Sequence, residues 1–561
     1  MGHLWHYLGM GFLFATCLLG INPLFGTTWR ALVCDVGTSE VYPIDLGSTP
    51  VAELPVSVSG APSSSVITPD ATWDVVTTVD ASPPNPEVTL NNIFGLDMTT
   101  NPISVAIGRT IATLSGPIAM TPDGTNVYVI DEAGDIIILQ ARDLSFVASI
   151  PQYVFGTYTP AYIALSPNES RGYITTNDTK VFVIDTDTNT LLSTSYTFAP
   201  GTQTGAISIT PDGSELYIGD MNSPDILYIV LSNGGLHTIS GAQYATTNGL
   251  AISSDGAFVY AVQDTQQTYN FLTKVSTATH AVVAEFQIPG QLILPALVAI
   301  TPDGAVACIT DAGEVQSQSE PGQYVAILDT ESGTSVVSPL QLSTSDVSAL
   351  LGVTITPDQA PTARFTHSTD RTTVTFDASS SSSPVGGIAT FAWDFGDGQT
   401  ATTSSPIITH TYIDGGTFAV VLTVTNTAGT STTVTYTGQV VSNNGGPSAV
   451  ESQQITIPRY GIESFEGEIV RKFNGRKVFL KTWWSKSLLR HAKKFVLYAR
   501  EKKVAVVKAH HRREKTLNLH LRSFPLTITE RYRHYLDHKY SIRVFDHAGH
   551  VSQPTFIHVK H

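Results

Sequence analysis

Positive charge and cysteine are scarce in this sequence. Of its 561 residues, 31 are Lys or Arg against 47 Asp or Glu, and three are cysteine. Three cysteines exclude a disulfide framework and a four-cysteine zinc site. Cys34 and Cys308 would meet an oxidising compartment if the chain is exported, and their spacing leaves open whether they pair.

The positive charge that does occur is concentrated at one end. Residues 1–450 contain 8 Lys or Arg against 38 Asp or Glu, whereas residues 451–561 contain 23 against 9. Such an asymmetry indicates a separate basic module with an acidic or polyanionic partner. The apolar content of 42% is enough to build hydrophobic cores, which excludes wholesale disorder.

Residues 8–25 form an uncharged, mostly apolar stretch, and the first Lys or Arg of the chain is Arg30. This length and polarity are typical of the hydrophobic part of a secretory signal. About 18 apolar residues can also just span a bilayer, although Asn22 and Pro23 interrupt this run. We expect residues 1–26 to be a signal peptide or an N-terminal apolar anchor, and the protein to be secreted or held at the cell envelope or surface.

A short motif recurs seven times between residues 27 and 358. Each copy is an apolar strand ending in Thr-Pro-Asp or a near variant, and successive copies are 43–55 residues apart. The copies begin at Thr68, Thr121, Ser166, Thr210, Ser253, Thr301 and Thr356. This period matches one four-stranded blade of a β-propeller, and the flanking strands alternate apolar and polar residues. The sequence therefore predicts a seven-bladed β-propeller over residues 27–358.

The motif also predicts how its turns form and how the ring closes. Proline sets φ for a tight turn, Asp can hydrogen-bond its own backbone, and the Gly that follows in four copies supplies a left-handed conformation. The seventh copy has no strands after it, while residues 31–35 and 40–45 have no motif before them. We predict that residues 352–356 pair beside residues 31–35, which completes one blade from both ends of the propeller.

The repeat resembles the YVTN family of seven-bladed propellers, in which Thr-Pro-Asp-Gly, a Tyr-Val strand and an Ile-Asp-x-x-Thr-Asn-Thr hairpin recur. Residues 127–131 contain the Tyr-Val strand, and residues 183–190 are close to the hairpin element. The resemblance covers residues 27–358 and departs from the family between residues 72 and 111. It implies a fold and an exported binding or surface protein rather than a particular reaction.

A second resemblance starts after residue 358. Segments 376–380, 391–398, 410–412 and 416–426 follow in the order found in PKD domains, which are immunoglobulin-like β-sandwiches of extracellular proteins. Alternation places Phe391, Trp393 and Phe395 on one face to fill the sandwich, with residues 394–398 as the turn beyond it. We expect a PKD-like β-sandwich over residues 359–442 that serves as a spacer or contact module.

The remaining chain reads as a linker and a further sandwich. Residues 443–450 have the composition of a linker, and residues 451–561 contain predicted strands at 495–499, 504–507, 540–545 and 555–560. A Trp-bearing early strand, a central Phe-Val-Leu-Tyr strand and a closing Tyr-Ser-Ile-Arg-Val segment resemble a fibronectin type III-like sandwich. The predicted fold class is all-β throughout, a propeller followed by two immunoglobulin-like β-sandwich domains.

The basic end supplies candidate binding residues. Its Lys and Arg side chains could contact phosphate or sulfate groups, with the salt dependence typical of such contacts. The candidates are Lys493, Lys494, Arg500, Lys502, Lys503, Lys508, Arg512 and Arg513. Docking against the acidic part of the same chain and ordinary solvated turns are the alternatives. Sequence-specific nucleic acid recognition is not expected, because no recognition helix or zinc-finger pattern accompanies the charge.

The expected function is binding or adhesion. The propeller would be a platform for a protein or carbohydrate ligand, with sandwich domains as spacers. The alternative is a propeller-funnel enzyme of the lactonase or quinone-dependent dehydrogenase type, which needs titratable groups converging on the funnel. Residues 27–358 supply only two histidines, His237 and His280, and no common hydrolase, P-loop or dinucleotide motif occurs. We therefore assign no catalytic, cofactor-binding or metal-binding residues.

Overall fold

The structure is a computed structural model that describes the chain from residue 29 onward, with gaps. The residues outside the description are 1–28, 80–91, 112–113, 169, 241–245, 265–269, 290–291, 293, 314–321, 371, 385–386, 414, 428, 433–434, 437–441, 444–445, 458–461, 473–474, 485–491, 500–501, 509–513, 521–539, 547–554, 557 and 560–561. The predicted signal or anchor, residues 1–26, lies outside the described residues. Side chains are not described for the strands beyond residue 461, with Arg543 as the exception.

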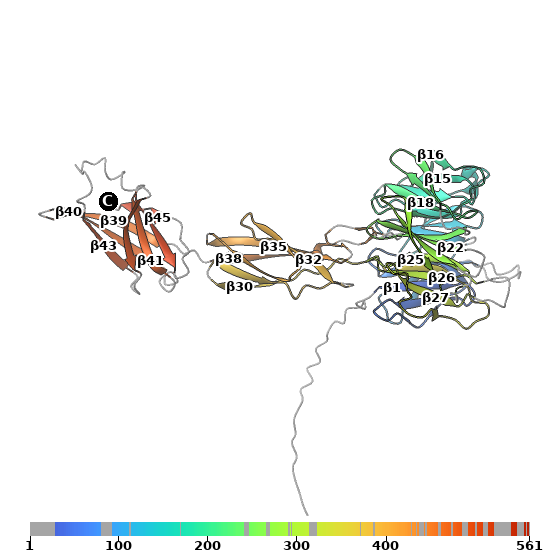
Figure 1. The fold of residues 1–561 in the computed structure, drawn as a ribbon, viewed down its shortest axis with the longest axis horizontal. Coiled ribbons are helices and arrows are strands. Elements are labelled where there is room, and N and C mark those ends of the chain that lie inside the picture. The colour runs from blue at the N-terminus through green and yellow to red at the C-terminus, as the bar shows by residue number, and fades with distance from the viewer. Residues whose placement is uncertain are drawn as a thin grey trace, which may run out of the picture. The chain divides into compact units, whose positions relative to one another are not determined.

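Seven antiparallel sheets make up the first part of the described chain (Figure 1, blue to yellow-green). Blade one contains β29 (Leu350–Ile355), β1 (Arg30–Asp35), β2 (Glu40–Asp45), β3 (Val51–Ala52) and β4 (Val56–Ser57). Blade two contains β5 (Ala61–Ile67), β6 (Trp73–Val79), β7 (Asn92–Asp97) and β8 (Ser104–Thr110). Blade three contains β9 (Leu114–Met120), β10 (Asn126–Asp131), β11 (Ile136–Gln140) and β12 (Phe146–Ile150), followed by the 3-10 helix η1 (Gln152–Phe155).

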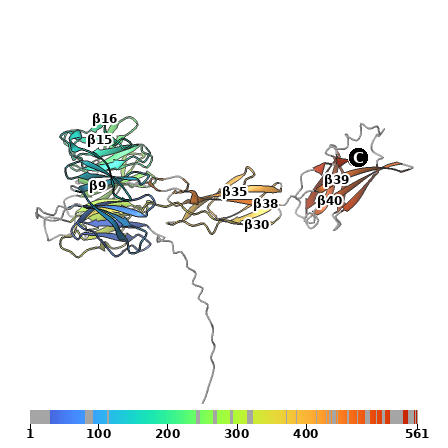
Figure 2. The ribbon, with the colours of Figure 1, turned by 180° about the vertical axis from the view of Figure 1, so that it is seen from behind.

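The other four blades repeat this plan. β15 and β16 of blade four are labelled in the view from behind (Figure 2). Blade four contains β13 (Tyr162–Leu165), β14 (Arg171–Thr175), β15 (Lys180–Asp185) and β16 (Thr190–Thr197). Blade five contains β17 (Thr204–Ile209), β18 (Glu215–Asp220), β19 (Ile226–Val230) and β20 (Gly235–Ile239). Blade six contains β21 (Thr246–Ile252), β22 (Phe258–Asp264), β23 (Phe271–Ser276) and β24 (Ala281–Gln287). Blade seven contains β25 (Pro295–Ile300), β26 (Val306–Asp311), β27 (Tyr324–Asp329) and β28 (Leu340–Gln341).

The ring of blades is closed by strands from its two ends. β29 pairs antiparallel with β1, and Ala31 lies opposite Ile355 and Val33 opposite Val353. Each innermost strand contacts the innermost strands of both neighbouring blades, from β5 in order through β25 to β29 and back to β5. The predicted pairing of residues 352–356 with 31–35 is therefore confirmed, and the sheets form a closed seven-bladed propeller.

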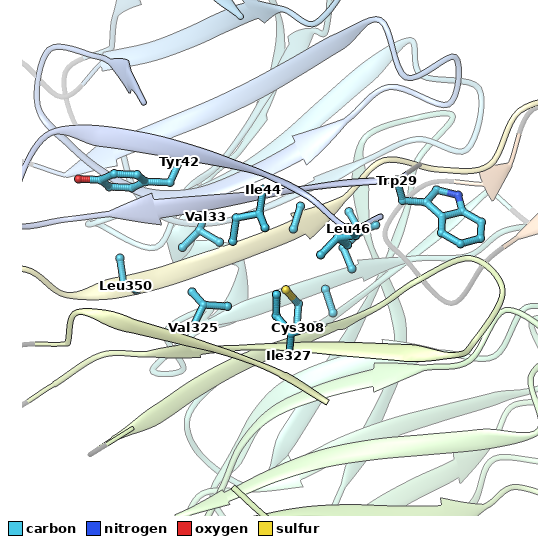
Figure 3. Close-up of a cluster of buried hydrophobic side chains, with 12 residues drawn as sticks. Trp29, Val33, Tyr42, Ile44, Leu46, Cys308, Val325, Ile327 and Leu350 are labelled. Atoms are coloured by element: carbon cyan, nitrogen blue, oxygen red, sulfur yellow. The ribbon is translucent and has the colours of Figure 1, made fainter. Parts of the chain in front are cut away.

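Apolar side chains fill the space between neighbouring blades. In Figure 3, Val33 and Ile44 of blade one approach Cys308 and Ile327 of blade seven, and all four side chains are buried. Trp29 belongs to the same cluster at the edge of this interface. Alternate residues of each strand supply these contacts, because both faces of a blade are covered by its neighbours.

Two further sheets follow the propeller and form the PKD-like sandwich. The first contains β30 (Thr366–Asp370), β31 (Thr373–Asp377) and β34 (Ile407–Thr411). The second contains β33 (Thr400–Thr403), β32 (Ile388–Asp394), β35 (Gly416–Asn426) and β38 (Val450–Ile457). A short pair, β36 (Thr435–Tyr436) with β37 (Ser442–Asn443), and the 3-10 helix η2 (Pro447–Ala449) precede β38.

The end of this sandwich differs from the expected boundary. Residues 443–450 were expected to be a linker, yet Ala449 in η2 is fully buried. β38 then pairs with β35 along its whole length, from Val450 opposite Thr423 to Ile457 opposite Gly416. The sandwich therefore gains a strand that the sequence pattern places in the next domain.

The basic end contains two more four-stranded sheets. One has the order β43 (Glu514–His520), β40 (Gly475–Trp484), β39 (Ile462–Lys472) and β46 (His558–Val559). The other has the order β42 (Lys502–Lys508), β41 (Ala492–Ala499), β44 (Tyr540–Asp546) and β45 (Thr555–Phe556). The described chain is thus all-β apart from two short 3-10 helices, as the sequence predicts.

Candidate functional site

The seven innermost strands of the propeller line one axial cavity. Its volume is about 710 Å³, and every blade contributes to its wall. This size lies in the range of small-molecule binding sites. The wall consists mainly of apolar and hydroxyl-bearing residues, among them Ser63, Ser65, Ile118, Tyr162, Ile163, Ser208, Leu250, Leu297 and Val353.

Ionisable groups are rare in the described wall of this cavity. It contains one carboxylate, Asp264, and one phenol, Tyr162, but no His, Lys or Arg. Burial raises the pKa of Tyr162, so its hydroxyl stays protonated. Asn248 donates from Nδ2 to the carbonyl oxygen of Pro295 at 3.1 Å and accepts from Thr246 at 3.3 Å. The cavity therefore offers shape, apolar surface and mostly neutral hydrogen-bonding groups.

The two propeller histidines lie around Tyr228 of β19 and not in the cavity wall. The rings of His237 and His280 stack on Tyr228, with centroids 4.7 and 4.3 Å from it. His280 Nε2 lies 2.9 Å from an oxygen of Glu215, and the Tyr217 hydroxyl donates to the other oxygen at 2.7 Å. This cluster joins blade five to the β23–β24 turn of blade six, a structural role for both histidines.

The Asp residues of the repeated motif are held inside their own turns. Thr121 Oγ1 donates to Asp123 Oδ1 at 2.6 Å, and the Thr125 amide donates to the same oxygen at 2.9 Å. Burial opposes ionisation of Asp123, but these hydrogen bonds outweigh it and lower its pKa. Equivalent bonds link Thr68 to Asp70, Ser166 to Asn168, Thr210 to Asp212, Ser253 to Asp255 and Thr301 to Asp303. The predicted turn role of these residues is confirmed.

A second set of aspartates, which the repeat motif does not reveal, ends the second strand of five blades. Its buried members are Asp35, Asp131, Asp220, Asp264 and Asp311. Asp35 Oδ1 accepts the Ala349 amide at 3.0 Å, and Asp220 Oδ1 accepts the Gln203 amide at 3.1 Å. Both amides lie just before the innermost strand of the same blade. The signal in the sequence is a strand that ends in Asp, and in blades one and five this residue holds the loop that leads into the innermost strand. Asp131 instead accepts the Asp135 amide, in the turn that follows its strand, at 2.8 Å.

Blades one and two enclose Cys34, Ser65 and Asp74, a set that could be mistaken for a nucleophile and its base. All three side chains are buried. Burial raises the pKa of the Cys34 thiol far above its ordinary value, so the thiol stays protonated and is a poor nucleophile. Cys34 and Cys308 are both buried free thiols, which answers the question of their pairing.

The part of the chain that the structure describes contains no group of three or more His, Cys, Asp or Glu residues placed to hold a metal ion. Residues 185–189, half of a calcium-loop pattern, form a hairpin. Asp185 Oδ1 accepts the amides of Asp187 at 3.0 Å and Thr188 at 2.8 Å. Within the described residues, no helix has the length and apolarity needed to cross a membrane.

The sandwich motif is structural, as predicted. Phe391, Trp393 and Phe395 are all buried, and the Tyr412 hydroxyl donates to the carbonyl oxygen of Phe395 at 2.9 Å. The Gly396 amide donates to Asp394 and the Gln399 amide to Asp397, which closes the turn. Asp397 also lies 2.8 Å from His410 Nε2. These groups hold the core and its turn and form no open site.

The predicted polyanion-binding residues are only partly described. Arg500, Arg512 and Arg513 lie outside the described residues. Lys493 and Lys494 are in β41, and Lys502, Lys503 and Lys508 are in β42, the strand beside it. In register, Lys494 lies directly opposite Lys508. Arg543, absent from the predicted set, lies on β44 on the other side of β41 and is exposed.

Comparison with known proteins identifies one domain of the chain. The family model described as the PKD domain matches residues 358–441. A microbial collagenase of Vibrio alginolyticus is 42% identical over 73 residues, which are 13% of this chain and 9% of that protein. The pre-pro-metalloprotease PrtV of Vibrio cholerae is 39% identical over 94 residues, 17% of this chain and 10% of that protein. The chain thus spans about a tenth of the length of the curated relatives it matches.

Two solved structures are similar to this chain at low identity. A functionally unknown protein from Desulfotomaculum acetoxidans matches with a TM-score of 0.46 and 14% identity, over 58% of this chain and 98% of that one. Hydrazine synthase from Kuenenia stuttgartiensis matches with a TM-score of 0.36 and 20% identity, over 47% and 76%. Neither likeness bears on function at these scores. The likenesses to the YVTN and fibronectin type III families stay predictions.

Proposed function

We propose that this protein is an extracellular binding or adhesion protein. Its propeller serves as a platform that recognises a protein or carbohydrate ligand. The PKD domain acts as a spacer, and the basic end contacts polyanions. The PKD match supports the extracellular location, since PKD domains belong to extracellular proteins and the matched Vibrio relatives include a collagenase.

One observation carries the proposal: the wall of the axial cavity is apolar and hydroxyl-bearing around a single carboxylate. Hydrolytic and redox sites need several titratable or metal-binding groups that converge on the reacting atoms. Here the histidines and most aspartates have structural partners elsewhere in the blades. A cavity of about 710 Å³ with neutral hydrogen-bonding groups suits recognition of an uncharged group.

The similarity to the Vibrio relatives gives no support for protease activity in this chain. They match it over 73 and 94 residues, and the match reaches 9% and 10% of their lengths. A shared domain of this kind is consistent with a spacer or a binding module in an extracellular protein. Several modules on one chain allow modest affinities to add through tethering.

The proposal is tested by screening the intact chain against glycan, lipid and protein arrays at low and physiological salt. We expect selective binding of at least one glycan or protein that survives physiological salt, and polyanion binding that weakens as salt rises. Lactonase and dye-linked dehydrogenase assays run on the same protein. Turnover of a substrate in these assays, or absence of any selective ligand, would overturn the proposal.

A further inference from the structure

Blade six carries its aspartate one residue later in the repeat than the flanking blades do. Asp220 of blade five and Asp311 of blade seven each stand 10 residues after the start of their motif copy. The residue at that position in blade six is Gln263, and Asp264 follows it. Each of the three equivalent residues is paired with the residue six places before its motif, which is Thr204, Pro295 and Thr247 in turn. Blade six therefore has an amide where its neighbours have the loop-holding carboxylate.

Gln263 has a structural role, which leaves the next position to Asp264. The Gln263 side chain is fully buried, and its Nε2 donates to the carbonyl oxygen of Pro224 in blade five at 2.8 Å. Asp264 occupies the position of Met221 in blade five and of Ala312 in blade seven, 11 residues after the motif start. All three residues of this position line the axial cavity, whereas the loop-holding aspartates of blades five and seven are not in its described wall. The shift by one residue thus places a carboxylate at a cavity-lining position.

The cavity wall is polar near Asp264 and aliphatic further along the axis. Thr246, which is paired with Asp264, donates to Asn248, and both residues line the cavity. Three residues before the motif, six of the seven blades place an aliphatic residue in the wall, namely Ile118, Ile163, Ile207, Leu250, Val298 and Val353. We call these six residues the aliphatic band. Because Leu250 follows Thr246 by four residues in β21, the band lies about 13 Å along the strand from the polar end.

The charge of the propeller favours a cationic group at the polar end. Residues 27–358 contain 6 Lys or Arg against 33 Asp or Glu, and the described cavity wall contains no His, Lys or Arg. A cavity lined by one sign of charge within low-dielectric walls attracts ligands of the opposite sign. An anionic ligand would be repelled, and a ligand without charge would not use the carboxylate of Asp264.

We infer that the axial cavity binds a small apolar amine, whose ammonium group meets Asp264 and whose uncharged body lies along the aliphatic band. This inference rests on the proposed recognition role of the propeller and names the class of ligand. A hydrogen bond between an ammonium group and a carboxylate is about twice as strong as a neutral one, and apolar surroundings strengthen it further. The cavity volume of about 710 Å³ is in the range that encloses a small molecule.

The test uses the full chain and three probes of equal length, which are n-octylamine, 1-octanol and octanoate. Isothermal titration calorimetry measures their affinities. We expect octylamine to bind about tenfold more tightly than octanol, because only the amine forms a charge-assisted bond. Octanoate is expected to bind at least about tenfold more weakly than octanol, because it is repelled by the acidic propeller.

Four variants locate the site, and thermal melting confirms that each is folded. D264N should reduce the preference for octylamine over octanol to within about twofold. D264N/M221D returns a carboxylate to the equivalent position of blade five and should restore most of the preference. D346N removes an exposed carboxylate outside the described wall and should leave the preference unchanged. A296F fills space at a wall position of β25 and should weaken octylamine and octanol alike by about tenfold or more.

The outcomes separate this inference from the broader proposal. Equal affinity of the unaltered chain for octylamine and octanol would overturn the inference, while a selective ligand in the array screen would still support the recognition role. A full preference retained by D264N, or octylamine binding unchanged in A296F, would also overturn it. Tighter binding of Nα-acetyl-lysine methylamide than of octylamine would overturn the assignment to a free small molecule in favour of a lysine side chain from a protein.

Discussion

At the scale of single residues, the acidic side chains of the propeller serve mainly as acceptors for backbone amides. One set closes the repeated turns, as Asp303 does by accepting from Thr301 at 2.6 Å and from the Ala305 amide at 3.0 Å. Members of the other set hold the loop before the innermost strand of their own blade, as Asp311 does by accepting the Leu294 amide at 2.9 Å. Abundant Asp in this chain is therefore a requirement of its turns and loops.

Asp74 departs from this pattern and gives the first prediction. Burial raises its pKa from the ordinary 3.8 to about 7 in the fold. Because the folded pKa exceeds the unfolded one, the folded state binds the proton more tightly, and stability falls as pH rises from about 4 to about 7. We expect D74N to remove most of this fall and to stabilise the protein by about 1–3 kcal/mol near pH 8.

Denaturant unfolding across this pH range measures the effect. Asp346 is exposed, so D346N is a control that should leave the pH dependence unchanged. If D74N kept the full loss of stability between about pH 4 and pH 7, burial of this carboxyl would not be its cause.

Two glycines of the repeated turn allow the cost of backbone strain to be measured apart from the cost of a clash between blades. Gly124 and Gly304 have similar left-handed φ values of 72° and 74°. A Cβ added at Gly124 would come within 2.6 Å of Cδ of Pro69 in the neighbouring blade, whereas one at Gly304 meets nothing within 4 Å. We expect G304A to cost about 1 kcal/mol and G124A about 1–3 kcal/mol more. Equal losses in thermal unfolding would show that Pro69 moves aside freely.

At the scale of elements, the closing blade holds the ring together. β29 follows six complete blades in sequence, yet it pairs with β1, the first strand of the described chain. The packing of blade one against blade seven shown in Figure 3 depends on this pairing, because its cluster draws on β1, β2 and β29. Opening the β1–β29 ladder would expose this core and the paired edges of β1 and β29, both in blade one.

A disulfide across the closing pair should therefore stabilise more than one across a neighbouring hairpin. Val33 is paired with Val353 on β29 and with Tyr42 on β2. V33C/V353C closes a loop of about 320 residues and V33C/Y42C one of about nine, which differ by about 3 kcal/mol in loop entropy. We expect the oxidised long-loop variant to show the larger gain in denaturant midpoint over its reduced form. A smaller gain than in the hairpin variant would contradict closure by this pair.

At the scale of the whole molecule, the seventh copy of the motif has a different task from the others. Asp358 accepts a hydrogen bond from Nδ2 of Asn426 in β35. Asn426 Oδ1 accepts the Thr430 amide at 2.8 Å, and Gln359 Nε2 donates to the Pro69 carbonyl at 2.8 Å. Asp358, the last residue of the repeat, is thus bound by a residue of the sandwich strand β35.

A pH-dependent variant tests this junction. Burial raises the pKa of Asp358 to about 6. N426D places a second carboxyl against it, so we expect a loss of about 2–4 kcal/mol near pH 8 and a smaller loss near pH 5, where one carboxyl is protonated. Thermal unfolding at the two pH values measures this difference.

The swap D358N/N426D restores one acid and one amide and should recover most of the stability lost in N426D. Hydrogen exchange of residues 356–362 locates the effect at the junction. If the swap and N426D were equally unstable at both pH values, direct contact between the two side chains would not explain the loss.

The sequence alone determined the elements that recur. Seven spaced copies of one turn motif predict seven blades, because Pro, Asp and Gly act within a few residues of each other. The unmatched ends at residues 31–35 and 352–356 predict the closing pair, since each end lacks the strands that the other supplies and a closed ring of blades leaves only short, protected edges. Alternation in residues 391–395 predicts the core of the sandwich, and all three aromatic residues are buried.

Tertiary structure decided what depends on neighbours distant in the sequence. Only the fold shows that Asp35 serves the Ala349 amide, that His237 and His280 stack on Tyr228, and that Cys34 and Cys308 are free. It also decided that β38 completes the PKD sandwich, since a strand's partner is chosen by register and packing rather than by local composition. The charge step at residue 450 was read from the sequence, but only the strand register places Lys494 opposite Lys508, because pairing joins residues that are distant in the sequence.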